Sequence, residues 1–224
     1  MKIADNVFLI PDVIANPYLI VDVDGLTLID AGLPRSHKKI LDYVASLGKS
    51  ARDVRRVLLT HSDLDHVGAL AALHEATGAR TCASNIEAGA IAAGKASRPI
   101  KRSGPSFRRL ILAALRPFMA ARPFKVDQIL TDGEVLPILG GLRVIDTAGH
   151  SPGHISFFAP AADVLFCGDS MVSTEQGLRG SRPELTWDQA RAADAVRRQA
   201  ALRPQIVCPG HGPVVRDAAR KFPV

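Results

Sequence analysis

Residues 57–68, with the sequence VLLTHSDLDHVG, place four potential metal ligands between an apolar run and a glycine. The apolar and β-branched residues 57–60 predict a short buried strand, and the alanine- and leucine-rich residues 69–73 predict the start of a helix. Imidazole and carboxylate groups are the ligands that borderline divalent ions take in proteins. The loop between strand and helix therefore predicts a metal site, built from His61, Asp63, Asp65 and His66.

Aspartates that precede a helix have a second ordinary role. Their carboxylates accept backbone N–H bonds and favour the positive end of the helix dipole. Capping explains one aspartate in this loop, but it does not explain two histidines interleaved with two aspartates. The metal interpretation therefore requires further ligands elsewhere in the chain.

Three later segments carry such residues, each beside a glycine and just beyond an apolar run. TAGHSPGH supplies His150, VLFCGDS supplies Asp169, and CPGHGP supplies His211. Strand ends that converge on one edge of a sheet sandwich form a natural site. We therefore predict that these three side chains lie beside the loop in residues 57–68.

The order HxxxDH, GHSPGH, GDS and PGHG resembles that of the metallo-β-lactamase superfamily of binuclear metallohydrolases, over nearly the whole chain. The resemblance implies an α/β fold, a four-layer αββα sandwich in which two sheets lie face to face with helices outside. It also implies two metal sites that share a bridging carboxylate. The first comprises His61, position 63 and His150, the second comprises Asp65, His66 and His211, and the bridge is Asp169. Asp30, at an earlier strand end, either supports this centre or caps a turn.

One position departs from the family pattern HxHxDH, because Asp63 replaces its second histidine. A harder, anionic oxygen donor favours iron or manganese at the first site, or weakens its hold on zinc. Flavodiiron proteins of the same superfamily are similar in carrying a carboxylate here. We expect two divalent ions, zinc first, with iron or manganese as alternatives.

The expected chemistry follows from this ligand set. Two ions roughly 3.5 to 4 Å apart can share a water and lower its pKa toward about 7, which makes metal-bound hydroxide the expected nucleophile. Asp65 is expected to orient that water and to carry a proton to the leaving group. The predicted function is hydrolysis of an ester, thioester, lactone or lactam bond in a small molecule. A phosphodiesterase acting on an anionic substrate, a di-iron oxidoreductase and a non-catalytic metal-binding module are the alternatives.

Hydroxyacylglutathione hydrolases of this superfamily carry a helical C-terminal extension that helps to bind glutathione. Thirteen residues follow His211 in this chain. The sequence therefore makes a thioesterase of that particular kind a weaker expectation than other carboxylic ester-like substrates.

The composition limits the expected number of domains, the cellular location and the disulfide content. The chain has 224 residues, 47% of them hydrophobic, so we expect one domain over residues 1–224. The sequence contains no apolar run of about eighteen residues and no secretory signal pattern, which predicts a cytoplasmic protein. Three cysteines are too few for a disulfide framework and are compatible with a reducing compartment.

Residues 88–126 contain nine lysines and arginines and no acidic residue, so the net charge of +6 resides in this segment. Apolar residues at helical spacing between 107 and 118 predict an amphipathic helix within a basic insertion at about residues 95–125. This helix is expected either to pack on the protein surface or to form a lid that favours anionic or acyl-bearing substrates. Contact with a membrane surface is a weaker alternative. Sparse aromatic residues and the absence of a base-reading motif disfavour nucleic acid. The sequence does not predict an oligomeric state.

The remaining elements follow from period-2 and period-3.6 patterns. The predicted strands are residues 6–10, 18–23, 26–29, 80–83, 126–130, 134–139, 142–146, 155–159 and 164–167, and the predicted helices are residues 34–47, 85–93 and 187–202. Thr186, with Gln189 three residues later, predicts a capping box for the last helix.

Overall fold

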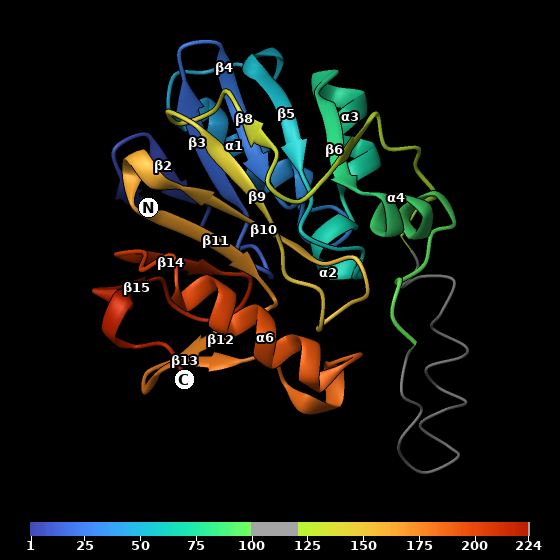
Figure 1. Ribbon diagram of the computed structural model, residues 1–224. Coiled ribbons are helices and arrows are strands. Elements are labelled where there is room, and N and C mark those ends of the chain that lie inside the picture. The colour runs from blue at the N-terminus through green and yellow to red at the C-terminus, as the bar shows by residue number, and fades with distance from the viewer. Residues whose placement is uncertain (100–120, 224) are drawn as a thin grey trace.

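Two β-sheets dominate the computed structural model, which describes residues 1–99 and 121–223 (Figure 1). The first sheet contains, from edge to edge, β1 (Lys2–Ala4), β2 (Val7–Leu9), β3 (Tyr18–Asp22), β4 (Gly25–Ile29), β5 (Val54–Leu58), β6 (Arg80–Ser84) and β7 (Gln128–Leu130). The second contains β15 (Val215–Arg216), β14 (Ile206–Pro209), β11 (Val164–Gly168), β10 (Ile155–Ala159), β9 (Leu142–Asp146) and β8 (Val135–Leu136). A separate hairpin comprises β12 (Met171–Thr174) and β13 (Gly177–Gly180).

The central strands β4, β10 and β11 bury both of their faces, and the two faces of a sheet belong to different apolar cores. In β3, Ile20 packs toward the second sheet whereas its neighbour Leu19 packs on the opposite face, as the period-2 geometry of a strand requires. Phe157 of β10 and Phe166 of β11 are cross-strand partners with no exposed surface in the core between the sheets. Burying each of these rings stabilises the fold by about 1.5–3 kcal/mol.

Helices cover the two outer faces. The outer face of the first sheet packs against α1 (His37–Ser46), α3 (Leu70–Thr77) and α4 (Asn85–Ala92). The outer face of the second sheet packs against α6 (Gln189–Ala200) through Val196. Figure 1 shows the yellow-to-red second sheet in front of the blue-to-green first sheet. The predicted αββα sandwich is therefore confirmed.

Strand direction brings the predicted ligand segments to one edge. β4, β5, β6 and β7 run parallel to one another in the first sheet, and β11 runs parallel to β14 in the second. β9 runs in the same direction as β11, because both are antiparallel to the intervening β10. The segments after β4, β5, β9, β11 and β14 therefore leave the sheets at shared edges.

Several predicted boundaries differ from the structure. The helix expected from residue 69 begins earlier, because α2 (Leu64–Val67) forms within the ligand loop. The predicted strand 134–139 shortens to β8, because Pro137 has no N–H to donate and the chain turns at Gly140. The β12–β13 hairpin was not predicted.

The capping box predicted for the last helix is wrong. α6 begins at Gln189, and its N-cap is Asp188, whose Oδ1 accepts the Arg191 N–H at 3.1 Å. The Thr186 hydroxyl instead contacts Ser181 Oγ at 2.9 Å and the Arg182 carbonyl at 2.7 Å. A short carboxylate directly before the helix satisfies the first backbone donors better than a threonine two residues further back.

The amphipathic helix predicted between 107 and 118 lies outside the described residues. Within the described ranges, no helix has the length and apolar character needed to cross a bilayer.

Candidate metal centre

All seven residues predicted as ligands meet at the shared edge of the two sheets. They form three overlapping groups, and within each group the potential ligand atoms lie within 4.8 Å of one another. The groups are His61, Asp63 and His150; His61, His66 and Asp169; and Asp65, His66 and His211. Asp65 and His211 are half-buried and the other five are buried.

Asp63 belongs to the first group. Its Oδ2 lies 3.3 Å from His150 Nε2 and 3.6 Å from His61 Nε2. Although Asp63 is the N-cap residue of α2, its side chain makes no capping hydrogen bond. The capping interpretation therefore fails for this aspartate.

Asp169 faces histidines of both outer groups. Its Oδ1 lies 3.3 Å from His66 Nε2, and its Oδ2 lies 3.5 Å from His211 Nε2 and 3.8 Å from His150 Nε2. On the more exposed side of the centre, Asp65 Oδ2 lies 3.2 Å from His211 Nε2. A carboxylate between two groups of imidazoles has the geometry needed to contact two cations at once.

Hydrogen bonds fix three imidazoles with Nε2 directed inward. His66 Nδ1 donates to Asp30 Oδ2 at 2.8 Å, and His61 Nδ1 contacts Thr60 Oγ1 at 3.0 Å. His150 Nδ1 contacts Ser181 Oγ at 2.9 Å. An oxygen bound to one ring nitrogen fixes the tautomer that leaves the other free for a metal.

Asp30 supports this arrangement rather than capping a turn. Besides His66, it accepts the Thr60 N–H at 2.9 Å, and its own backbone has the left-handed φ of +61°. Such a φ is strained for a residue other than glycine and is typical of sites whose geometry is tightly constrained. Thr60 links Asp30 to His61.

Four inward-facing polar atoms are buried and make no hydrogen bond with the described residues: His61 Nε2, His66 Nε2, Asp63 Oδ1 and Asp169 Oδ1. Buried polar atoms without partners are costly and rare. Two imidazole nitrogens and two carboxylate oxygens without partners form a donor set suited to divalent cations. The residues present therefore fit a metal.

Comparison with known proteins agrees with this geometry. Residues 10–211 match the sequence model of the metallo-β-lactamase superfamily. The chain belongs to this superfamily. It is 29% identical over 216 residues to the probable metallo-hydrolase YflN of Bacillus subtilis (strain 168), covering 89% of this chain and 81% of that protein.

Two further similarities have narrower scope. A hydroxyacylglutathione hydrolase of Rhodobacter capsulatus is 30% identical over 161 residues, which cover 70% of this chain and 48% of that protein. This chain therefore spans about half of the length of that relative. A metallo-β-lactamase with a HARLDQ motif from Cronobacter sakazakii has a similar fold, with a TM-score of 0.72 at 24% identity, covering 94% of this chain and 79% of the other. The chain is thus a superfamily hydrolase whose substrate is not fixed by these likenesses.

His154 contacts the backbone of Asp169, the residue that was expected to bridge the two metal sites. Its Nε2 accepts the Asp169 N–H at 3.1 Å, and its Nδ1 lies 2.8 Å from Thr147 Oγ1. Burial, together with the neighbouring His61 and His150, lowers the pKa of His154 well below its usual range. His154 is thus a neutral group that holds the backbone at Asp169.

Glu87 was missed by sequence analysis. This fully buried carboxylate accepts the Ser62 N–H at 2.9 Å and the Gly153 N–H at 3.0 Å. It also accepts the hydroxyls of Ser151 at 2.6 Å and Ser97 at 2.8 Å. Glu87 therefore joins the two loops that carry His61 and His150. The spacing of Ser84 and Glu87 is that of a capping box, which was the only sequence signal for this glutamate.

Arg98 was also missed, because it was considered only as one of the basic residues of the insertion at about residues 95–125. Its Nε and Nη2 donate to Asp63 Oδ2 at 3.0 Å and 2.5 Å. The Arg98 side chain is only 14% exposed. A cation of the chain itself therefore contacts the residue that departs from the family pattern.

The carboxylates of the centre are held ionised. Burial alone would raise the pKa of Asp63, but the hydrogen bond from His150 and the nearby His61 and Arg98 outweigh burial and keep that pKa well below its usual range. Burial opposes ionisation of Asp169 as well, but the charge of the adjacent His66 lowers its pKa. Both carboxylates are thus anionic at neutral pH, as metal ligands must be.

Two of the imidazoles hold protons more tightly than a free histidine does. Burial acts to lower the pKa of His66, but the charges of Asp169 and Asp30 raise it well above its usual range. The hydrogen bond with Asp65 raises the pKa of His211. Metal binding at these nitrogens must therefore displace protons.

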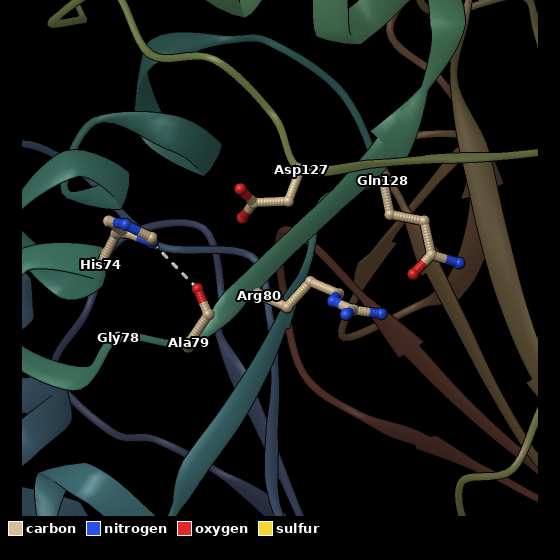
Figure 2. Close-up of a pocket in the computed structure, with 6 residues that line it drawn as sticks. All are labelled: His74, Gly78, Ala79, Arg80, Asp127 and Gln128. Carbon is tan, nitrogen blue, oxygen red and sulfur yellow. Dashed lines mark hydrogen bonds between the residues drawn. The ribbon is translucent and has the colours of Figure 1, made fainter.

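A separate hollow lies on the first sheet, between α3 and the strands β6 and β7 (Figure 2). Two of its polar side chains bind nearby protein groups. His74 Nδ1 donates to the Ala79 carbonyl at 2.9 Å, and Asp127 Oδ2 accepts the Thr81 N–H at 2.8 Å. This hollow contributes no residue to the three ligand groups.

Proposed function

We propose that this chain is a binuclear metal-dependent hydrolase of a carboxylic acid derivative, namely an ester, thioester, lactone or lactam of a small molecule. The observation that carries the proposal is a set of four potential metal-ligand atoms, buried and without hydrogen-bond partners, at the centre of seven converging side chains. In this proposal His61, Asp63 and His150 hold one ion, and Asp65, His66 and His211 hold the other. Asp169 contacts both ions.

Bound divalent ions would supply Lewis acidity that activates a water and polarises the substrate oxygen. Zinc is the ion proposed first, because four imidazoles and three carboxylates form a mixed nitrogen and oxygen set. The chain contributes orientation, because Thr60, Asp30 and Ser181 fix the rings of three of these histidines.

Asp65 is the proposed proton carrier. It is 31% exposed, whereas Asp63 and Asp169 are about 10% exposed, so Asp65 can reach both the centre and a substrate entering from solvent. Its Oδ2 lies 3.2 Å from His211 Nε2, which orients the carboxylate. Asp65 is therefore suited to orient the attacking water and to pass its proton to the leaving group.

One comparison favours a carboxylic derivative over a phosphodiester. One relative is named as a hydroxyacylglutathione hydrolase, which suggests thioesters for this chain also.

The test is elemental analysis combined with turnover of a thioester, a lactone, a β-lactam and bis-p-nitrophenyl phosphate. We expect about two ions per chain and metal-dependent turnover of a carboxylic derivative that a chelator abolishes. Asp169→Asn should lose both metal and turnover. Asp127→Asn, a matched change in the separate hollow, should retain both. Turnover that survives metal removal, or preferred cleavage of the phosphodiester, would overturn the proposal.

The oxidoreductase alternative depends on Asp63, because an oxygen donor favours iron. Protein grown without added zinc distinguishes the two functions. Bound iron with a visible absorption band, together with oxygen consumption and no hydrolysis, would favour the oxidoreductase.

A further inference from the structure

One oxygen of Asp63 is shared between the predicted metal centre and a cation of the chain. Arg98 Nε and Nη2 lie 3.0 Å and 2.5 Å from Asp63 Oδ2, which also lies 3.3 Å from His150 Nε2. The other oxygen, Oδ1, is buried and makes no hydrogen bond to the described part of the chain. An ion bound by Asp63 would therefore lie close to a guanidinium group.

Arg98 is held at this position by its neighbour in the chain. The Ser97 N–H donates to Ser62 Oγ at 2.9 Å, and Ser62 lies between His61 and Asp63 in the ligand loop. The Ser97 hydroxyl donates to Glu87 Oε1 at 2.8 Å. The backbone that presents Arg98 is thus attached to the same loop that presents Asp63, and the contact is built into the site.

Charge explains what this contact does. Two neutral imidazoles with one carboxylate have a net charge of −1, whereas three imidazoles are neutral. The Arg98 guanidinium makes the first group neutral overall. Its positive charge is permanent, because arginine does not lose its proton in proteins. The second group, Asp65, His66 and His211, has no arginine or lysine paired with it among the described ion pairs. The two sites therefore differ in charge.

We infer that Arg98 is the fixed counter-charge of Asp63 and sets the metal affinity of the first site. The pair of Asp63 and Arg98 replaces the family's neutral histidine as one charge-neutral unit. Because the guanidinium repels an incoming dication and competes for the Asp63 oxygen, the first site binds its ion more weakly than the second. The ions therefore bind in order, with the second site filled first. This inference rests on the proposed function, because it requires the same seven residues to bind metal.

The test is metal titration of chelator-stripped protein, with zinc and with manganese, against a competing indicator. Arg98→Gln removes the charge and keeps hydrogen-bonding groups, whereas Arg98→Lys keeps the charge. Arg122→Gln is the matched control, because Arg122 also pairs with a carboxylate, Glu75, but is 70% exposed. None of these measurements depends on turnover.

We expect two unequal affinities in the wild-type protein. Arg98→Gln should tighten the weaker site at least about tenfold, because a charge a few ångströms from the ion is removed. Arg98→Lys should change it by less than about threefold, and Arg122→Gln should leave it unchanged. If the wild-type protein binds a single ion, Arg98→Gln should bind two.

The thermal stability of the metal-free protein provides a second measurement. Here Arg98→Gln is expected to be destabilising, whereas it is expected to tighten metal binding. Metal-free Arg98→Gln should unfold at a lower temperature than the wild-type protein, because Asp63 loses its cationic partner, and metal should raise its Tm by more. An unchanged or weakened first site in Arg98→Gln would overturn the inference, whatever the turnover. Ordered binding of two ions without hydrolysis would overturn the proposed function and leave this inference standing.

Discussion

Replacement of Glu87 tests whether one buried carboxylate holds the two ligand loops together. Its Oε1 accepts three hydrogen bonds, from the Ser97 and Ser151 hydroxyls and the Gly153 N–H, and its Oε2 accepts the Ser62 N–H. Glu87→Gln retains the shape and can still accept the three bonds on one side. On the other side, its amide NH₂ would face the Ser62 N–H, so that two donors oppose each other.

The magnitude follows from these contacts. Leaving one buried N–H unsatisfied costs about 1–3 kcal/mol, and the remaining bonds lose the assistance of a charge. We therefore expect Glu87→Gln to lower the free energy of unfolding by about 2–4 kcal/mol. Glu87→Ala abandons two backbone donors and two hydroxyls and leaves a cavity, so its loss should be larger, about 4–6 kcal/mol. Either value is a large fraction of the stability of a typical domain, about 5–15 kcal/mol.

The assay is urea unfolding of the metal-free protein together with metal titration. Glu75→Gln is the control, because Glu75 is 58% exposed. Glu87→Gln should also weaken metal binding at the site of His61 and His150, since their loops lose a common support. Stability within about 0.5 kcal/mol of the wild-type protein, with unchanged metal affinity, would refute this role for Glu87.

Three further predictions concern the centre itself. Asp30→Ala should weaken metal binding by about 10- to 100-fold in the same titration, because His66 loses the carboxylate that orients it; an effect below threefold would contradict that role. Asp169→Asn should remove both ions from purified protein by elemental analysis, and retention of two ions would contradict its bridging position. Metal affinity should rise with pH through neutrality, because the raised pKa values of His66 and His211 leave protons that the ion must displace. Calorimetry in two buffers of different ionisation enthalpy should detect this proton release, and identical heats would exclude it.

The positions of the predicted ligands could be foreseen because each follows an apolar strand. Parallel strands end at the same edge of a sheet, which brings together the segments after β4 and β5 in the first sheet and those after β11 and β14 in the second. The packing of the two sheets, which joins His61 to His211, was implied by the resemblance to the superfamily. The same reasoning covers Asp30, which follows β4. For these residues, the local sequence pattern and the strand topology both predict a position at the metal centre.

The supporting contacts could not be foreseen, because they join segments through single side chains. Glu87 has the spacing of an ordinary capping residue, and Arg98 is one of nine basic residues in a segment where no local pattern indicates its partner. Their partners, Ser151 and Asp63, lie 64 and 35 residues away. The failed cap at Thr186 has the same cause, since a bond to Ser181 takes the hydroxyl that a local pattern assigned to the helix.

The most direct test of the central claim is anomalous diffraction from crystals of metal-loaded protein, recorded at the absorption edge of the ion that elemental analysis identifies. Two anomalous peaks should appear, one beside His61, Asp63 and His150 and one beside Asp65, His66 and His211, with Asp169 between them. Peaks confined to other parts of the molecule, or no peak at either group in fully loaded protein, would contradict the claim that these seven side chains form a binuclear metal centre.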